Sequence, residues 1–333
     1  MSEFPGKIAI LGSGSWATAL AKILMTGDRP LLWHIRRPDR IEEFKKTHRN
    51  PVYLSDVVFD VDRIDFSSDI NYICENADTI LLATPSPYLK DNLSKITVDI
   101  SDKYIINAVK GIVPDENMIV TDYVHKRFGI DLKKCLVIGG PCHAEEVAME
   151  RLSYLTIGCE DFSLAKTFCQ YMSSKKLRTI PSSDVVGIEY AAVLKNIYAI
   201  ASGMIHGLKS GDNFLAMLVC NAVKEMDRFV NTLSPSTTRN ICDSVYLGDL
   251  LVTCYSQFSR NHNFGSMIGK GYTVKAAKME MEMVAEGYFA TKCIHEINER
   301  YKVKMPILEW VYEVLYNRQR PDKIFMRMAN ALS

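Results

Sequence analysis

The stretch Lys7-Ile-Ala-Ile-Leu-Gly-Ser-Gly-Ser-Trp-Ala17 decides how the first half of this chain folds. Its apolar run predicts a buried strand, and the helical pattern that follows predicts a helix beginning at the glycines. Gly12 permits the tight turn, Gly14 lets the backbone approach a pyrophosphate, and the helix N-terminus offers N–H groups and a positive dipole. Ala17 stands at the usual third glycine position, which is a permitted variant. The stretch therefore predicts a dinucleotide-binding βαβ unit.

Two arginines, Arg36 and Arg37, follow the second expected strand at 30–35. Enzymes that use NAD strictly carry Asp or Glu here, to hold the ribose 2′-hydroxyl. The arginines could stack on adenine, bind a 2′-phosphate or form a solvated basic turn. The missing carboxylate argues against a strict NAD preference, so both NAD and NADP remain open.

The distribution of apolar runs predicts two domains. Four further short runs alternate with helical patterns, at 79–83, 104–109, 135–138 and 155–157. This alternation is typical of a mostly parallel, doubly wound sheet. After residue 184 no convincing strand follows, and helical periodicity covers about 185–208, 212–232, 238–248, 273–284, 287–300 and 306–317. We therefore expect an α/β fold, with a Rossmann-type domain at 1–184 and an all-helical substrate domain at 185–333.

Composition excludes several classes of partner. The 333 residues include 40 basic and 39 acidic ones, which gives no indication of binding to nucleic acid or an anionic membrane. Nine scattered cysteines without a Cys-x-x-Cys pair indicate a reducing compartment. The N-terminus lacks the pattern of a signal peptide, and no apolar run reaches the length of a membrane span. We expect a cytoplasmic protein with no membrane insertion and, from the histidine spacing, no metal.

A charged residue interrupts the apolar segment at 189–203. This segment is predicted to be a helix that is apolar nearly all round and therefore buried. Lys195 and Asn196 lie in its middle, and small side chains flank them. A partly desolvated lysine beside open space has a lowered pKa and can donate a proton near neutral pH. The alternative is a lysine that reaches solvent or pairs with a core carboxylate.

Two segments follow strands of the expected sheet, where ligands bind in open α/β folds. Lys110 ends the strand at 104–109, so it either meets substrate or cofactor or lies in a surface turn. Gly140, Cys142 and His143 follow the strand at 135–138. Cys142 and His143 resemble a thiol–imidazole pair, but neighbours in sequence rarely point at each other, and a structural role for His143 is favoured.

Polar residues of the helical half form three more candidates. Asp249 and Thr253 are one helical turn apart and share a face. Ser259-Arg-Asn261 offers a hydroxyl, a guanidinium and an amide, which suit a phosphate, although a capped helix end with a solvated arginine is equally compatible. Glu286 is expected at a helix C-terminus, where its charge is unfavourable with the dipole and hints at a function.

Seven motifs in fixed order cover nearly the whole chain. They are Gly-Ser-Gly-Ser-Trp-Ala-Thr-Ala-Leu-Ala at 12–21, Val-Lys-Gly at 109–111, Gly-Pro-Cys-His-Ala-Glu-Glu at 140–146, Leu-Lys-Asn at 194–196, Gly-Asp-Leu at 248–250, Ser-Arg-Asn at 259–261 and Val-Ala-Glu-Gly at 284–287. The set resembles the NAD(P)-dependent glycerol-3-phosphate dehydrogenases of the bacterial biosynthetic type. The resemblance implies a helical domain like the C-terminal domain of 6-phosphogluconate dehydrogenase. It also implies a homodimer and the reduction of dihydroxyacetone phosphate to sn-glycerol 3-phosphate for phospholipid synthesis.

The resemblance also implies a role for each matching residue. Lys195 is the general acid toward the ketone and the base in reverse, and Asp249 hydrogen-bonds either this lysine or the substrate hydroxyls. The substrate is expected to contact Lys110, Gly140, Cys142, Lys195, Asp249, Ser259, Arg260 and Asn261. The cofactor is expected to contact Gly12, Gly14, Ser15, Trp16, Arg36, Arg37, Lys110, Ala144, Arg260, Val284 and Glu286.

Two departures from the family pattern and two alternative functions accompany this resemblance. The family usually has Ser or Thr where Cys142 stands and an aromatic residue where His143 stands, so a contact through the Cys142 side chain is in doubt. The first alternative function is that of ketopantoate reductase, which has a similar two-domain layout and also uses a lysine, but which does not need Ser259, Arg260 and Asn261 to bind a phosphate. The second is a non-catalytic nucleotide sensor, which would bind cofactor without turnover.

Overall fold

The computed structural model describes residues 4–256, 258–281 and 285–332. The chain divides into two compact units. The sheet unit contains residues 1–109 and 120–185, and the helical unit contains residues 110–119 and 186–333. The expected single domain boundary near residue 184 is therefore found, but a second segment also changes unit. The segment 110–119, which follows a strand of the sheet, belongs with the helices.

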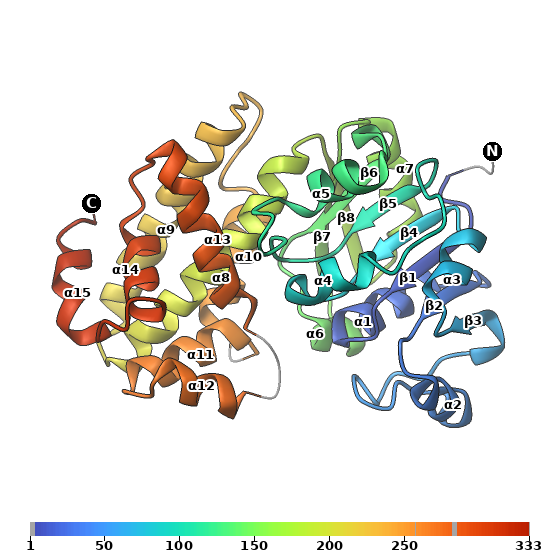
Figure 1. The fold of residues 1–333 in the computed structure, drawn as a ribbon, viewed down its shortest axis with the longest axis horizontal. Coiled ribbons are helices and arrows are strands. Elements are labelled where there is room, and N and C mark those ends of the chain that lie inside the picture. The colour runs from blue at the N-terminus through green and yellow to red at the C-terminus, as the bar shows by residue number, and fades with distance from the viewer. Residues whose placement is uncertain (1–3, 257, 282–284, 333) are drawn as a thin grey trace. The chain divides into compact units, whose positions relative to one another are not determined.

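The sheet unit is built on eight strands in the order β3-β2-β1-β4-β5-β6-β7-β8 (Figure 1). They are β1 (Ile8–Leu11), β2 (Leu31–His34), β3 (Ile64–Ser67), β4 (Thr79–Leu82), β5 (Tyr104–Asn107), β6 (Cys135–Gly139), β7 (Ser153–Cys159) and β8 (Leu177–Ser182). Neighbouring strands are parallel except β6 and β7, which are antiparallel. Strands β1, β2 and β4 are buried at every position, which explains their continuous apolar sequences. The predicted doubly wound sheet is confirmed.

Helices connect these strands. They are α1 (Ser15–Leu24), α2 (Pro38–Thr47), α3 (Ile70–Asn76), α4 (Ser86–Leu93), α5 (Val120–Phe128), α6 (Ala144–Ala148) and α7 (Phe162–Met172). Strands β3 and β8 were not expected from the sequence. β3 alternates buried and less buried residues, and most of β8 is not buried, so neither forms the apolar run that marks a central strand.

The helical unit contains no strand among its described residues. Its helices are α8 (Val185–Gly207), α9 (Asp212–Leu233), α10 (Asp249–Tyr255), α11 (Arg260–Gly269), α12 (Val274–Glu280), α13 (Glu286–Tyr301), α14 (Pro306–Leu315) and α15 (Pro321–Ala329). A π-helical turn at Ser244–Gly248 leads directly into α10. The predicted all-helical second half is confirmed, whereas the helix expected at 238–248 is wrong, because regular structure begins only at this turn.

Helix α8 is the core of the helical unit. It is long and apolar enough to cross a membrane, which the sequence did not lead us to expect, but its side chains are buried inside the protein as in a soluble core helix. Glycines bring α11 into backbone contact with it. A Cβ atom on Gly203 would lie 2.0 Å from the His262 carbonyl oxygen, and one on Gly265 would lie 2.1 Å from that of Ile200. This close approach fixes α11 beside the C-terminal half of α8.

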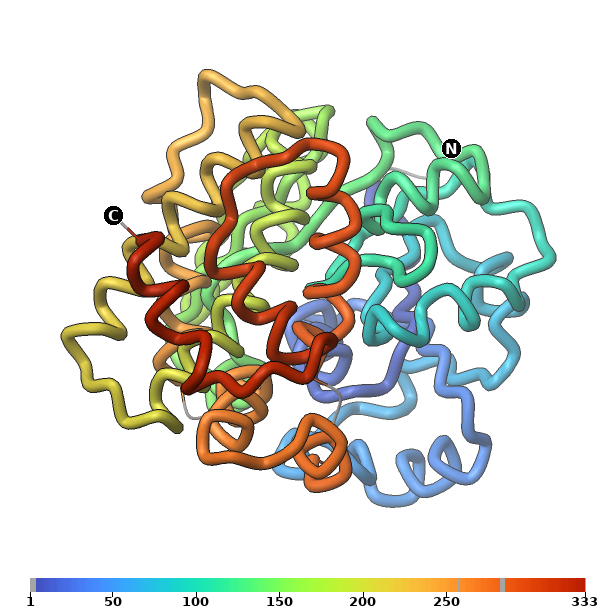
Figure 2. Tube along the Cα trace, turned by 60° about the vertical axis from the view of Figure 1, so that its left-hand side comes forward, coloured from blue at the N-terminus to red at the C-terminus, as the bar shows by residue number. Residues whose placement is uncertain are grey.

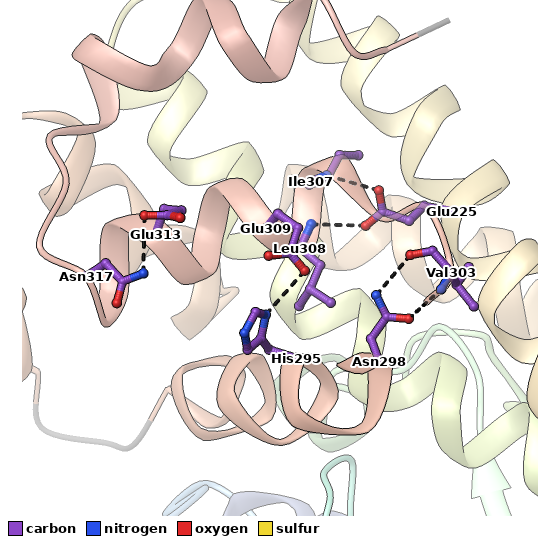
Figure 3. Close-up of polar contacts among 9 residues, drawn as sticks. All are labelled: Glu225, His295, Asn298, Val303, Ile307, Leu308, Glu309, Glu313 and Asn317. Atoms are coloured by element: carbon purple, nitrogen blue, oxygen red, sulfur yellow. Dashed lines mark hydrogen bonds and ion pairs between the residues drawn. The ribbon is translucent and has the colours of Figure 1, made fainter. Parts of the chain in front are cut away.

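Helices α13, α14 and α15 lie next to one another at the C-terminal end (Figure 2). Asn298 closes the α13–α14 connection with two hydrogen bonds to Val303, each 2.9 Å. Glu225 of α9 then accepts the N–H groups of Ile307 and Leu308, both at 3.0 Å, at the first turn of α14 (Figure 3). Burial raises the pKa of the Glu225 carboxyl to about 8. A fully buried acid therefore caps this helix.

Candidate functional site

The glycine turn between β1 and α1 has the geometry expected of a phosphate-binding loop. Gly12 has φ +133°, and a Cβ atom there would lie 2.7 Å from the Ala83 carbonyl oxygen, so only glycine fits. At Gly14 a Cβ atom would meet nothing within 4 Å, because the backbone borders open space. Gly14 is the N-cap of α1, and no side chain caps that helix. The first N–H groups of the helix are thus left for a ligand.

Ser15 and Trp16 are the first two residues of α1. The Trp16 indole Nε1 donates to the Ala108 carbonyl oxygen at 3.1 Å. Its ring is half-buried, so it lies fixed between helix α1 and the end of β5. The ring position is therefore set by the protein, and the predicted contact of Trp16 with the cofactor stays a prediction.

Arg36 and Arg37 follow β2 and are both exposed. Arg37 forms a two-pronged ion pair with Asp39, in which Nε donates to Oδ1 at 3.1 Å and Nη2 contacts Oδ2. The side chain of Arg36 has no polar partner among the described residues. Of the two arginines, Arg36 is thus the one with an uncommitted guanidinium for adenine or a 2′-phosphate.

Gly140, Cys142 and Ala144 follow β6 in the sheet unit. Gly140 has φ +115°, and a Cβ atom there would approach the Tyr154 carbonyl oxygen to 3.1 Å, so glycine is required. Cys142 is 6% exposed, and Ala144 begins α6. These residues lie in the sheet unit and Lys195 lies in the helical unit, so their predicted contacts with substrate and cofactor stay predictions.

Lys195 of α8 and Asp249 of α10 form a buried ion pair. Lys195 is 4% exposed and Asp249 is 2% exposed, and Nζ donates to Oδ1 at 2.5 Å. Asp249 Oδ2 is buried and has no hydrogen-bond partner among the described residues. Thr253 supports the pair from within α10, because its hydroxyl donates to the Asp249 carbonyl oxygen at 2.6 Å. A buried acceptor without a hydrogen-bond partner among the described residues therefore belongs to the carboxylate that contacts the lysine.

Opposing effects act on the Lys195 ammonium. Burial has the largest effect and lowers its pKa, the charge of Asp249 raises it, and the charge of Lys110 lowers it again. The pKa that results is about 8. A lysine with this pKa exists in both protonation states near neutral pH, so it can donate and accept a proton. The pairing with a core carboxylate, which the sequence left open as an alternative, is thus present, and the role of Lys195 as a proton donor stays a prediction.

A chain of amides joins four segments around Lys195. Asn196 Nδ2 donates to the Lys110 carbonyl oxygen at 2.8 Å, and Asn196 Oδ1 accepts from Asn261 Nδ2 at 2.9 Å. Asn261 Oδ1 accepts from the Gly287 N–H at 2.9 Å. Asn196 is 6% exposed and Asn261 is 8% exposed. The network fixes the 110 segment and the first turns of α11 and α13 around the lysine.

Ser259, Arg260 and Asn261 form the start of α11. The Ser259 hydroxyl is the N-cap and accepts from the His262 N–H at 3.2 Å. The predicted capped helix end is therefore confirmed, whereas the phosphate contact stays a prediction; Arg260 stands at a helix N-terminus, where anions bind favourably. Asn261 commits its oxygen and one amide hydrogen to the network, which leaves one hydrogen for a substrate.

Glu286 requires a correction. It is the first residue of α13 and does not end a helix, because the preceding helix α12 stops at Glu280. Its carboxylate lies at the favourable, positive end of the helix dipole, so the inferred electrostatic conflict does not exist. Val284, the other predicted cofactor contact of this segment, lies outside the described residues.

The structure also identifies residues that sequence reasoning missed. Trp33 and Asn50 hydrogen-bond the glycine turn of the sheet unit. A tryptophan in an apolar strand needs a partner for its N–H, but the sequence does not say which one. Among the described residues, no group of three His, Cys, Asp or Glu could hold a metal ion.

Comparisons with known proteins agree across both units. Residues 7–165 match the family model of the NAD-dependent glycerol-3-phosphate dehydrogenase N-terminus, and residues 184–326 match that of its C-terminus. A glycerol-3-phosphate dehydrogenase of the NAD(P)+ type from Lysinibacillus sphaericus is 32% identical, covering 97% of this chain and 96% of the relative. One from Bacillus subtilis is 33% identical and covers 95% and 92%. The crystal structure of glycerol-3-phosphate dehydrogenase from Coxiella burnetii has a TM-score of 0.89 at 26% identity, covering 98% and 99%.

Proposed function

Because the chain belongs to the NAD-dependent glycerol-3-phosphate dehydrogenase family, we propose that it reduces dihydroxyacetone phosphate reversibly at C2, with Lys195 as the proton donor. The product in this direction is sn-glycerol 3-phosphate. The observation that carries the residue assignment is the buried Lys195–Asp249 pair, in which the lysine has a pKa of about 8 and the second carboxylate oxygen has no hydrogen-bond partner among the described residues.

The protein's part of the reaction is orientation and proton transfer. Bound NAD(P)H supplies the hydride. As negative charge develops on the C2 oxygen, the Lys195 ammonium donates its proton there, and neutral Lys195 accepts a proton in the oxidation direction. Asp249 orients the amine through Oδ1, and its free Oδ2 is suited to accept a hydrogen bond from a substrate hydroxyl. The charge of Lys110 keeps the lysine acidic enough to release its proton.

The remaining polar groups are suited to the two ends of the ligands. Arg260, at the N-terminus of α11, offers a charged, two-pronged contact for the substrate phosphate. This remote contact supplies binding energy that positions the ketone. The turn at Gly12–Gly14 and the start of α1 are suited to the cofactor pyrophosphate. We expect a homodimer in the cytoplasm, and light scattering over a range of protein concentrations tests the oligomeric state.

A substrate comparison with a lysine variant tests the proposal. The parent protein is expected to oxidise NADH or NADPH with dihydroxyacetone phosphate and not with ketopantoate. Lys195→Met is expected to bind NADH normally but to lose about 10²–10⁴-fold in kcat, the usual contribution of a proton donor. Lys209→Met, which changes an exposed lysine beyond α8, serves as the matched control. Near-parental turnover in Lys195→Met would show that another group donates the proton.

A further inference from the structure

We propose that Trp33 and Asn50 are positioning residues of the cofactor site, which hold the carbonyl groups of the glycine turn so that its N–H groups face the cofactor pyrophosphate. The inference rests on the proposed function only in taking the pyrophosphate of NAD(P)H as the ligand of this turn. Every contact that supports it lies within the sheet unit.

Trp33 holds the first peptide of the turn. It lies on β2, is fully buried, and its indole Nε1 donates to the Gly12 carbonyl oxygen at 2.7 Å. Aromatic neighbours fix the indole. The ring centroids of Phe44, Phe59 and Phe66 lie 5.3, 5.6 and 6.0 Å from that of Trp33. A buried, closely packed ring cannot reorient, so the direction of the Gly12 carbonyl is fixed.

Asn50 holds the second peptide. It follows α2, is 3% exposed, and its Nδ2 donates to the Ser13 carbonyl oxygen at 3.1 Å and to the Thr18 hydroxyl at 2.8 Å. Its Oδ1 accepts the N–H groups of Val52 and Tyr53 at 3.0 and 3.1 Å. Both amide hydrogens and the amide oxygen are used, which determines the orientation of the side chain completely.

The third peptide is held from within α1. The Gly14 carbonyl oxygen accepts from the Thr18 N–H at 3.0 Å and from the Thr18 hydroxyl at 2.9 Å. Asn50 donates to that same hydroxyl, so Asn50 also orients Thr18. All three carbonyl groups of the turn, from Gly12 to Gly14, therefore have protein partners.

These contacts determine where the N–H groups of the turn point. In a trans peptide the C=O of one residue and the N–H of the next lie in one plane and point in opposite directions. Holding the carbonyls of residues 12–14 therefore directs the N–H groups of Ser13, Gly14 and Ser15 the opposite way. No described residue accepts a hydrogen bond from these three N–H groups. The turn is thus a preformed set of donors for an anion, and Trp33 and Asn50 maintain it.

The test is the binding of ligands with and without a pyrophosphate. Dissociation constants for NADH, ADP-ribose and adenosine are measured on the parent protein and on Trp33→Phe and Asn50→Ala, by NADH fluorescence and by competition. We expect both variants to bind NADH and ADP-ribose about ten-fold more weakly, as the loss of one to two hydrogen bonds predicts. Adenosine, which has no phosphate, should bind with unchanged affinity.

A control variant separates positioning from loss of stability. Asn71→Ala removes another asparagine that ties a loop in the same unit, where its Oδ1 accepts the Thr97 N–H at 2.8 Å. This variant should not lose affinity selectively for ADP-ribose. If Asn50→Ala does not fold, Trp33→Phe still tests the proposal, because it conserves most of the ring volume.

The outcomes distinguish a failure of this inference from a failure of the proposed function. Parental ADP-ribose affinity in the folded variants would overturn the inference, and so would an equal loss for adenosine or an equal loss in Asn71→Ala. A parent protein that binds neither NADH nor NADPH would instead contradict the proposed function.

Discussion

Replacing Asp249 by asparagine removes the negative charge that contacts the Lys195 ammonium at 2.5 Å. Burial lowers the pKa of Lys195 and the Asp249 charge opposes this effect, so that the pKa is about 8. An asparagine occupies nearly the same volume but stabilises the ammonium less. The pKa of Lys195 should therefore fall further in Asp249→Asn, and the proton needed for ketone reduction should be lost at a lower pH.

The size of this change follows from the effect of a neighbouring charge. An adjacent opposite charge moves a pKa by about 1–3 units, so a change of about 2 units places the pKa of Lys195 at about 6 in the variant. With a pKa of about 8, the protonated fraction is about two-fold larger at pH 6 than at pH 8, whereas with a pKa of about 6 it is about fifty-fold larger. The ratio of reduction rates at these two pH values should rise accordingly.

The assay follows the loss of NADH absorbance with dihydroxyacetone phosphate and reports kcat/KM between pH 5.5 and 9. The substrate phosphate also titrates near about pH 6, but it does so in both proteins, so the ratio of variant to parent isolates the enzyme group. In Asp249→Glu, which keeps the charge, kcat/KM should fall with rising pH at nearly the same pH as in the parent. If Asp249→Asn loses activity equally at every pH, Asp249 does not control the protonation of Lys195.

Three further predictions concern other residues. Arg260→Ala should raise KM for dihydroxyacetone phosphate about 10–100-fold, the range expected for a charged hydrogen bond, and should leave the weak reduction of dihydroxyacetone unchanged in initial-rate assays. Arg36→Ala should weaken NADPH binding about ten-fold more than NADH binding. Arg37→Ala should change the binding of both cofactors little, because Arg37 pairs with Asp39. Equal effects of the two variants in fluorescence titrations would contradict this prediction. The Glu225 carboxyl has a folded-state pKa of about 8, above its ordinary value of 4.5, so its stabilisation is complete below pH 4.5 and is lost as the pH rises through 8. Calorimetry should show that Tm falls more between pH 6 and pH 9 in the parent than in Glu225→Gln.

The local sequence predicted those features that depend on residues close together in the chain. The apolar run before Gly12 predicted a strand, and the helical period of 189–203 predicted a buried helix around Lys195. Both predictions are confirmed, because burial on all sides selects apolar residues at every position of the element. Strand β8 was not predicted and the position of Glu286 was predicted wrongly, because an edge strand and a helix boundary produce little periodic signal.

The sequence by itself thus determined the fold class, the glycine turn and the presence of a lysine in an apolar helix. Only the tertiary structure decided which groups meet that lysine and that turn. Asp249 is 54 residues from Lys195, and Trp33 is 21 residues from Gly12. Such partners are selected by the packing of helices and strands in three dimensions, and no local pattern records them. The pKa of Lys195, which makes it a possible proton donor, is therefore a property of the folded chain.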